Sequence, residues 1–177
     1  DYGGVKKRRL SIETDVGNRE VTAKEDEFIV NMGEPSFDAS GFAATEETID
    51  EPFMFDRKRT ITLVSMGNPH CVSFVDDVGN FPLEEVGPLF EKNPIFPNRV
   101  NAEFVELVSP TYAKMRVWER GTGETLACGT GTCATVVACI LNGKTEDEVT
   151  VKLLGGELII RWDRDENIVY MTGPAKV

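Results

Sequence analysis

One glycine-rich segment combines a thiol with charged side chains in a way that could support proton-transfer or nucleophilic chemistry. Residues 118–132 read WERGTGETLACGTGT, and Cys128 stands directly before a predicted helix. The start of a helix presents backbone N–H groups without intrahelical acceptors, together with the positive end of the helix dipole. Such a place binds an anion such as a carboxylate, and it favours a thiolate. We therefore expect an anion pocket beside Cys128 and a lowered pKa for its thiol, with Glu119 and Arg120 nearby in sequence.

A purely structural role for the same segment stays open. Glycines also shape tight loops, and a single cysteine before a helix often only packs. Cys133 and Cys139 fall inside the apolar helix and are expected to be buried, unreactive thiols. The glycine pattern is not a dinucleotide-binding signature, because no strand-to-helix crossover with an acidic residue about twenty positions on follows it.

A second group of candidate residues is the segment Gly67-Asn68-Pro69-His70. Asn68 could be a turn former, and His70 could be a satisfied, half-buried histidine. A Cys128–His70 dyad for acyl transfer is an alternative, although no third orienting residue can be identified from spacing. The C-x4-C-x5-C spacing from Cys128 to Cys139, with only one histidine in the chain, does not fit a zinc site. Reduced thiols and a cytoplasmic setting are expected.

The elements that position these residues read as strands around one helix. Residues 132–141 are apolar or small on every face and are bracketed by glycines, so they are expected to form a helix enclosed by protein, with a buried strand as the alternative. A surface helix is predicted over residues 83–92, after Pro82. Strands are predicted over residues 10–14, 19–23, 27–32, 59–66, 71–75, 101–108, 112–118, 149–154, 157–162 and 168–172.

Two connections are predicted with these strands. Gly17-Asn18 is expected to form the turn of a hairpin, and the strand that begins at residue 59 is expected to be interrupted at residues 67–69 and then to continue. The pattern as a whole predicts an α+β fold, with a mostly antiparallel sheet curled around a central buried helix.

Composition excludes several classes of partner. The 177 residues are 41% hydrophobic and 28% charged, which is typical of a globular protein. The net charge of −11 argues against nucleic-acid binding, and the basic run at residues 6–9 is interpreted as a solvated strand edge. No apolar stretch is long enough to span a membrane, and no signal-peptide pattern is present.

Three motifs resemble the successive signatures of the diaminopimelate epimerase family. They are GNPH at residues 67–70, RVNAEF at residues 99–104 and the ERGTGET and ACGTG stretches within residues 119–131. Residues 30–35 (VNMGEP) resemble the family's join between two domains. The resemblance covers nearly all of the chain and implies the family's fold, in which two pseudo-symmetric domains each surround a helix.

The resemblance also implies a division of the chain. Residues 1–28 would be orphan, remnant strands of the N-terminal domain, mobile or paired with another molecule through their open edges. Residues 29–173 would form the C-terminal domain, and residues 174–177 would start the return to the N-terminal domain. The family's second catalytic cysteine lies in a Cys-Gly-Asn-Gly motif that is absent here. The chain is therefore expected to be a fragment that is inactive alone.

The implied activity is that of an isomerase in lysine biosynthesis. It interconverts LL- and meso-diaminopimelate with two thiols, without pyridoxal phosphate or metal. Cys128 matches the proton-accepting thiol, while Glu119 and His70 match residues that tune the thiols. Gly129 and Thr130 match positions whose backbone N–H groups hold the substrate carboxylate.

The distal end of the substrate is expected to be held by another set of matched residues. The resemblance assigns that contact to Asn68, Asn101, Glu119 and Arg120. Glu124 and Arg99 also lie in the motifs but are interpreted as salt-bridged loop supports. Cys71 is placed in the core, because His70 and Cys71 point to opposite faces of a strand.

Two other functions remain open from the sequence. One is a different cofactor-free racemase of the same fold, such as a proline racemase, although proline has no distal group for Glu119 and Arg120 to hold. The other is a non-catalytic amino-acid-binding domain. The sequence leaves the oligomeric state undecided, with a homodimer as one option.

Overall fold

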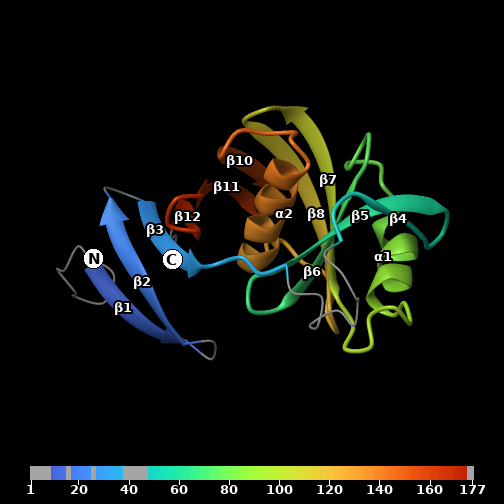
Figure 1. Cartoon of the computed structure of the whole chain (residues 1–177), viewed down its shortest axis with the longest axis horizontal. Helices are drawn as coiled ribbons and strands as arrows, with labels where there is room; N and C mark the ends of the chain where they lie inside the picture. Colours follow the sequence, from blue (N-terminus) through green and yellow to red (C-terminus); the bar gives the residue numbers. More distant parts are fainter. Residues whose placement is uncertain (1–8, 15–16, 25–26, 38–47, 175–177) are drawn as a thin grey trace.

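The computed structural model describes residues 9–14, 17–24, 27–37 and 48–174. Within these residues the chain forms mostly strands, together with two helices (Figure 1). The elements are β1 (Arg9–Thr14), β2 (Gly17–Lys24), β3 (Glu27–Gly33), β4 (Glu51–Met54), β5 (Lys58–Ser65), β6 (Pro69–Phe74), α1 (Leu83–Glu91), β7 (Asn101–Ser109), β8 (Tyr112–Glu119), β9 (Gly123–Glu124), α2 (Gly129–Leu141), β10 (Glu148–Leu153), β11 (Gly156–Asp163) and β12 (Ile168–Pro174).

The strands of the described residues join into one sheet. Its order is β1-β2-β3-β12-β11-β10-β8-β7-β6-β5-β4, and β9 pairs with β8 outside this path. Every pairing is antiparallel except β6 with β7 and β8 with β10. The predicted α+β class with a mostly antiparallel sheet is confirmed, and each predicted strand is present with its ends shifted by at most two residues.

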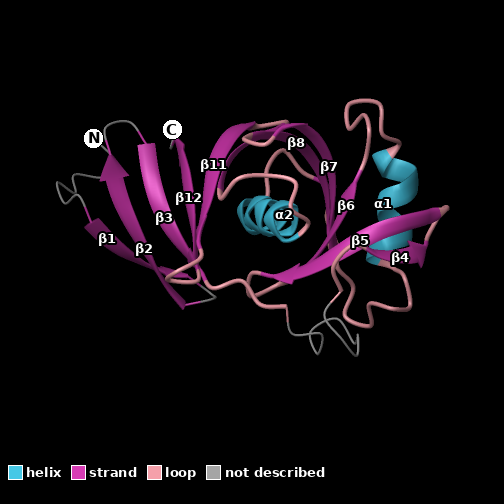
Figure 2. Cartoon of the chain, turned by 45° about the horizontal axis from the view of Figure 1, so that its top comes forward, coloured by secondary structure: helices cyan, strands magenta, loops and turns pink. Residues whose placement is uncertain are grey.

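Helix α2 lies inside the molecule. Every residue from Gly131 to Ile140 is buried, as the sequence predicts for a helix that is apolar on all faces. The helix packs against β5, β6, β7, β10, β11 and β12, and Figure 2 shows it almost end-on with strands on several sides. It begins at Gly129, three residues before the predicted start. It ends at Leu141, with Asn142 as its C-cap residue, after which Gly143 takes the left-handed φ of 64° that favours glycine.

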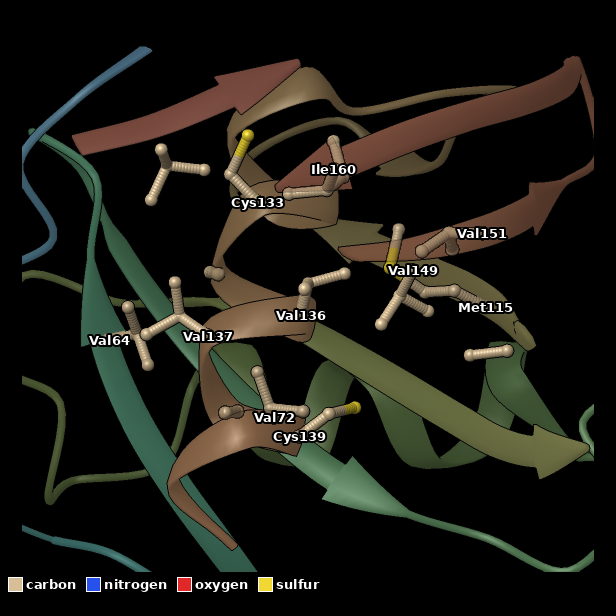
Figure 3. Close-up of a cluster of buried hydrophobic side chains, with 14 of the residues drawn as sticks. Val64, Val72, Met115, Cys133, Val136, Val137, Cys139, Val149, Val151 and Ile160 are labelled. Carbon is tan, nitrogen blue, oxygen red and sulfur yellow. The ribbon is translucent and has the colours of Figure 1, made fainter. Parts of the chain in front are cut away.

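Two hydrophobic clusters hold the elements together. In the larger one, Cys133 and Cys139 of α2 pack among valines and other apolar side chains from the surrounding strands (Figure 3). Cys71 belongs to the second cluster, with Phe90 of α1 and Phe104 of β7. The predicted core positions of these three cysteines are confirmed.

Three expectations about the strands are wrong. Gly17 and Asn18 do not form a turn but lie within β2, where they pair with Thr14 and Glu13. The chain does not continue straight after β5 but folds back, because β5 and β6 are antiparallel and joined by a turn in which Gly67 has a φ of 92°. The amino-terminal strands are not orphans, since β1 pairs with β2, β2 with β3, and β3 with β12.

The basic run falls almost entirely outside the described residues. Of its four residues only Arg9 is described, in β1 at one end of the strand order. Neither of the helices in the described ranges is long and apolar enough to cross a membrane.

Candidate active site

Cys128 is the N-cap residue of α2. Its extended backbone (φ −134°, ψ 107°) turns the side chain back over the first turn of the helix, where Sγ accepts the backbone N–H of Gly131 at 3.4 Å. Sγ also lies 3.7 Å from Oγ1 of Thr130. The carbonyl oxygen of Cys128 accepts both the backbone N–H and the hydroxyl of Thr132, at 2.8 and 2.7 Å. The thiol is thus fixed at the start of the helix, where the sequence placed it.

The pKa of this thiol is raised, which corrects the prediction. Burial raises the pKa of Cys128 to about 11, and the negative charges of Glu103 and Glu119 act in the same direction. The Gly131 N–H and the Thr130 hydroxyl favour the thiolate but are outweighed. The prediction gave most weight to the helix end, whereas the structure adds the burial of the thiol and the charge of Glu103, which comes from β7.

The first turn of α2 offers unused backbone donors. Within the described part of the chain, the N–H groups of Gly129 and Thr130 donate to no protein acceptor. Both groups belong to the turn that carries Cys128, where a helix leaves its donors unpaired. The arrangement can therefore hold an anion next to the thiol.

A chain of side-chain hydrogen bonds leads from the interior to this turn. His70 of β6 is fully buried, with its Nδ1 atom 2.6 Å from Oε1 of Glu103 and its Nε2 atom 2.9 Å from Oδ1 of Asn68. Asn68 in turn donates through Nδ2 to Oγ1 of Thr130 at 3.2 Å. Both ring nitrogens of His70 are engaged by these partners, so a direct Cys128–His70 dyad is not formed.

Asn101 links two of the sequence motifs. Its Nδ2 atom donates to the carbonyl oxygen of Pro69 at 3.0 Å, and its Oδ1 atom accepts the backbone N–H of Arg120 at 2.9 Å. The amide is buried, so its function in this structure is to hold the GNPH segment against the turn that carries Arg120. The exposed guanidinium of Arg120 donates to the carbonyl oxygen of Asn98 at 3.1 Å.

Glu119 lies at the end of β8 and is half-buried. One of its carboxylate oxygens accepts the hydroxyl of Thr125. Its charge acts on Glu103 and on Cys128, which places it on the same side of the molecule as the thiol. Glu119, His70, Asn68, Thr130 and Cys128 therefore belong to one site, as the sequence analysis expects.

Helix α1 supports the turn after β8. Glu91 is buried and accepts Nε1–H of Trp118 at 2.9 Å and the backbone N–H of Gly121 at 2.9 Å. Arg99 donates to the same carboxylate at 3.2 Å. The helix approaches β8 closely at Gly87, where a Cβ atom would lie 2.6 Å from the Trp118 side chain.

The two motif residues interpreted as loop supports have that role. Glu124 forms a two-pronged ion pair with Arg116, at 2.7 and 3.0 Å. Arg99 pairs with Glu91 of α1. The prediction that Glu124 and Arg99 stabilise loops through salt bridges is confirmed.

Comparison with known proteins decides the family. The family model described as diaminopimelate epimerase matches residues 62–177. The chain belongs to the diaminopimelate epimerase family. It is 50% identical over 184 residues to the diaminopimelate epimerase of Acetivibrio thermocellus, an alignment that covers 99% of this chain and 66% of that protein.

Other curated diaminopimelate epimerases are similar over most of the chain. The protein of Methanococcus maripaludis strain C5 is 48% identical over 178 residues, covering 96% of this chain and 64% of the relative. The protein of Synechococcus elongatus is 60% identical over 120 residues, covering 68% and 42%. The chain thus spans about two thirds or less of the length of these relatives.

Solved structures of distant proteins share the fold. A hydroxyproline epimerase from Agrobacterium vitis superposes with a TM-score of 0.68 at 13% identity, covering 98% of this chain and 58% of that one. A probable proline racemase from Agrobacterium radiobacter K84 gives a TM-score of 0.67 at 14% identity, covering 98% and 62%. At these identities the likeness concerns the fold alone.

Two residues of this diaminopimelate epimerase family member were not singled out from the sequence. Glu103 lies in the RVNAEF motif, and the only available signal was a charged residue between Ala102 and Phe104 in a predicted strand. For Glu91 the only signal in the sequence was its helical spacing from the residues on the buried face of α1. Both are buried carboxylates, and a buried carboxylate needs a specific partner.

Proposed function

We propose that this chain is the part of a diaminopimelate epimerase that carries one of two catalytic thiols, Cys128. The enzyme would interconvert LL- and meso-diaminopimelate, a step of lysine biosynthesis, by proton transfer without pyridoxal phosphate or metal. The observation that carries the proposal is the position of Cys128 as N-cap of α2, beside the unpaired N–H groups of Gly129 and Thr130. A thiol and an anion site adjoin there, as α-proton transfer on an amino acid requires.

The anion site would serve the substrate's α-carboxylate. When the α-proton leaves, negative charge spreads onto this carboxylate, and preorganised donors stabilise that charge. The two N–H groups at the start of α2 are fixed by the helix and need no reorganisation. They would both orient the substrate and lower the barrier to proton removal.

Because the pKa of Cys128 is raised, substrate binding must favour the thiolate before Cys128 can act as a base. At neutral pH a thiol with a pKa of about 11 is protonated, so it can donate a proton but cannot accept one. The substrate carries an α-ammonium group, and a positive charge beside a thiol favours the thiolate. We infer that the bound substrate itself helps to generate the base.

The distal amino-acid end would contact Arg120. This side chain is exposed at the turn after β8, while the Asn101 amide fixes its backbone. A guanidinium pairs with a carboxylate through two parallel hydrogen bonds, which suits a second amino-acid group. Asn68, Asn101 and Glu119 would complete this side of the site, with Glu119 and His70 also tuning the thiol.

The second thiol is assigned to the portion of the relatives that this chain does not cover. Inversion requires a base and an acid on opposite faces of the α-carbon. Cys71, Cys133 and Cys139 are fully buried in the hydrophobic clusters and cannot serve. We propose that the sheet around α2 forms one of two pseudo-symmetric domains, with the boundaries near residues 28 and 174. A cytoplasmic location fits the four free thiols.

The test is NMR of LL-diaminopimelate in deuterated water with the complete protein. Formation of the meso isomer with deuterium at the α-carbon is expected. Inversion of L-proline or trans-4-hydroxy-L-proline instead would favour the racemase alternative, and tight binding without exchange would favour a binding domain. The 177-residue chain alone should give no inversion. Full inversion by this chain would refute the two-thiol assignment.

A further inference from the structure

Glu103 is a fully buried carboxylate at the centre of the site. It lies on β7, which pairs with β6 in parallel so that Glu103 stands opposite Val72 and His70 stands opposite Asn101. Its Oε1 atom lies 2.6 Å from Nδ1 of His70. Its Oε2 atom has no hydrogen-bond partner among the described residues. One carboxylate oxygen is thus paired with the histidine. The other accepts no hydrogen bond that would stabilise a negative charge on it.

The hydrogen bonds fix how many protons the pair holds. Asn68 donates through Nδ2 to Thr130, so its Oδ1 atom faces His70. An amide oxygen only accepts, and Nε2 of His70 must therefore carry a hydrogen. A second proton must then lie between Nδ1 and the carboxylate, because two lone pairs 2.6 Å apart would repel. Glu103 and His70 share that proton.

The carboxyl group also borders the thiol. A Cβ atom built on Gly131 would lie 2.6 Å from Oε1 of Glu103 and 3.1 Å from Sγ of Cys128. The two groups therefore flank the same glycine at the first turn of α2. A negative charge on Glu103 acts on Cys128 directly, and the chain through His70, Asn68 and Thr130 reaches the same thiol from the other side.

The surrounding titratable groups are few and can be named. His70 from β6 and Glu119 from β8 act on Glu103. The charge of Glu103 acts in turn on Cys71 and on Cys128, and the charge of Cys128 acts on Cys133. Burial raises the pKa of Glu103 to about 7, against the opposing effect of His70. The group therefore titrates where the enzyme would work.

We propose that Glu103 is a positioning residue that shares one proton with His70, holds the Asn68–Thr130 hydrogen bonds in place and sets the charge beside Cys128. Its bearing on epimerisation rests on the proposed function, but its effect on the thiol does not. Once the shared proton leaves, a net negative charge stands beside Cys128 and opposes thiolate formation. A glutamine at this position keeps a donor for Nδ1 and cannot carry that charge.

The first test measures the alkylation rate of Cys128 by iodoacetamide as a function of pH, by peptide mass spectrometry on this chain. Glu103→Gln should move the midpoint to lower pH, so that the rate at pH 8.5 rises roughly three- to tenfold. The matched control is Glu106→Gln, on the same strand but bound to Lys114 and the Val78 N–H. Its rate should equal that of the wild type, and Glu103→Asp should keep the midpoint high.

An unchanged midpoint in a folded Glu103→Gln chain, checked by circular dichroism, would overturn the proposal. A second measurement needs no variant. His70 is the only histidine of the chain, so its ring nitrogens can be assigned directly by nitrogen-15 NMR. Protonated Nε2 from pH 5 to 8 is expected, and an unprotonated Nε2 would contradict the shared-proton arrangement. Neither readout requires epimerase activity, so failure of the proposed function would leave both tests valid.

In the complete protein the same substitution bears on catalysis. Glu103→Gln should shift the pH profile of kcat in the direction in which it shifts alkylation of Cys128. Glu103→Asp should restore the wild-type profile. A merely structural role would lower the midpoint of thermal unfolding without moving either profile, and that result would overturn the assignment.

Discussion

The carboxylate of Glu91 accepts the backbone N–H of Gly121 at 2.9 Å and thereby ties helix α1 to the turn that carries Arg120. The other oxygen of the same carboxylate accepts Nε1–H of Trp118, at the end of β8. Two side chains therefore hold this turn: the buried Glu91 carboxylate accepts the Gly121 N–H, and the Asn101 amide accepts the Arg120 N–H. The position of Arg120 thus depends on Glu91 and on Asn101.

Replacing Glu91 by glutamine should destabilise the fold and loosen this turn. The Glu91 carboxylate accepts hydrogen bonds from Arg99, Trp118 and Gly121. A glutamine has no negative charge, and its N–H₂ group would face one of these donors. Loss of charge-assisted hydrogen bonds of this kind costs roughly 1.5–3 kcal/mol. Urea unfolding would measure the change. Glu84→Gln, on the exposed face of the same helix, is the control and should change stability by about 0.5 kcal/mol or less.

Gly131→Ala should be more harmful than Gly129→Ala. An added methyl group at Gly131 meets the Glu103 carboxylate at 2.6 Å in a closed interior, whereas at Gly129 it meets only the flexible Met171 side chain, at 3.3 Å. Overpacking of this kind costs about 1–3 kcal/mol. The two variants would be compared by thermal unfolding. Equal stability of the two would show that the Glu103 carboxylate does not lie against this turn.

Stability should fall as pH rises through the titration of Glu103. The pKa of this carboxyl group is about 7 in the folded chain, mainly because burial disfavours its charge, and about 4.5 when unfolded. Between these values the folded state binds more protons, so unfolding becomes easier with increasing pH. The wild type should lose roughly 3 kcal/mol more than Glu103→Gln between pH 4.5 and 7.5. The free energy of unfolding would be measured by urea unfolding at each pH. An equal change with pH in the two proteins would contradict the raised pKa.

Arg120→Lys should weaken substrate binding in the complete protein. A lysine keeps the positive charge but cannot reproduce a two-pronged contact with a carboxylate. The KM for diaminopimelate should rise roughly tenfold or more, as the loss of a charge-assisted hydrogen bond implies. Arg161→Lys, in the exposed ion pair with Asp163, serves as control. A KM and kcat unchanged by Arg120→Lys would place this side chain outside the pocket.

The helices and strands were largely predictable because their signals are local. A segment that is apolar on every face between glycines favours an enclosed helix over a buried strand, and α2 is such a helix. The position of Cys128 before that helix followed from the same pattern. The turn expected at Gly17-Asn18 was wrong, because alternation along two strands does not fix where each strand begins, and Gly17 pairs within β2.

The chemistry of the site was less predictable because it depends on non-local contacts. The Glu103–His70 pair exists only because β6 and β7 lie side by side in parallel, and the two partners are 33 positions apart along the chain. The pKa of Cys128 was expected to be lowered by the helix end. Its burial and the charges of Glu103 and Glu119 reverse that direction, and neither the burial nor the approach of Glu103 can be read from residues 118–132 alone.

The most direct test of the account is α-proton exchange by a Cys128→Ala variant of the complete protein. Exchange of the LL-diaminopimelate α-proton with deuterated water would be followed by NMR, with Cys139→Ala, which alters a buried thiol in the core of α2, as the control. We expect Cys128→Ala to slow exchange at least about a hundredfold, the usual contribution of a positioned acid or base. Cys139→Ala should exchange within about a factor of a few of the wild-type rate. Exchange by Cys128→Ala at the wild-type rate would contradict the assignment of Cys128 as the thiol that transfers the proton.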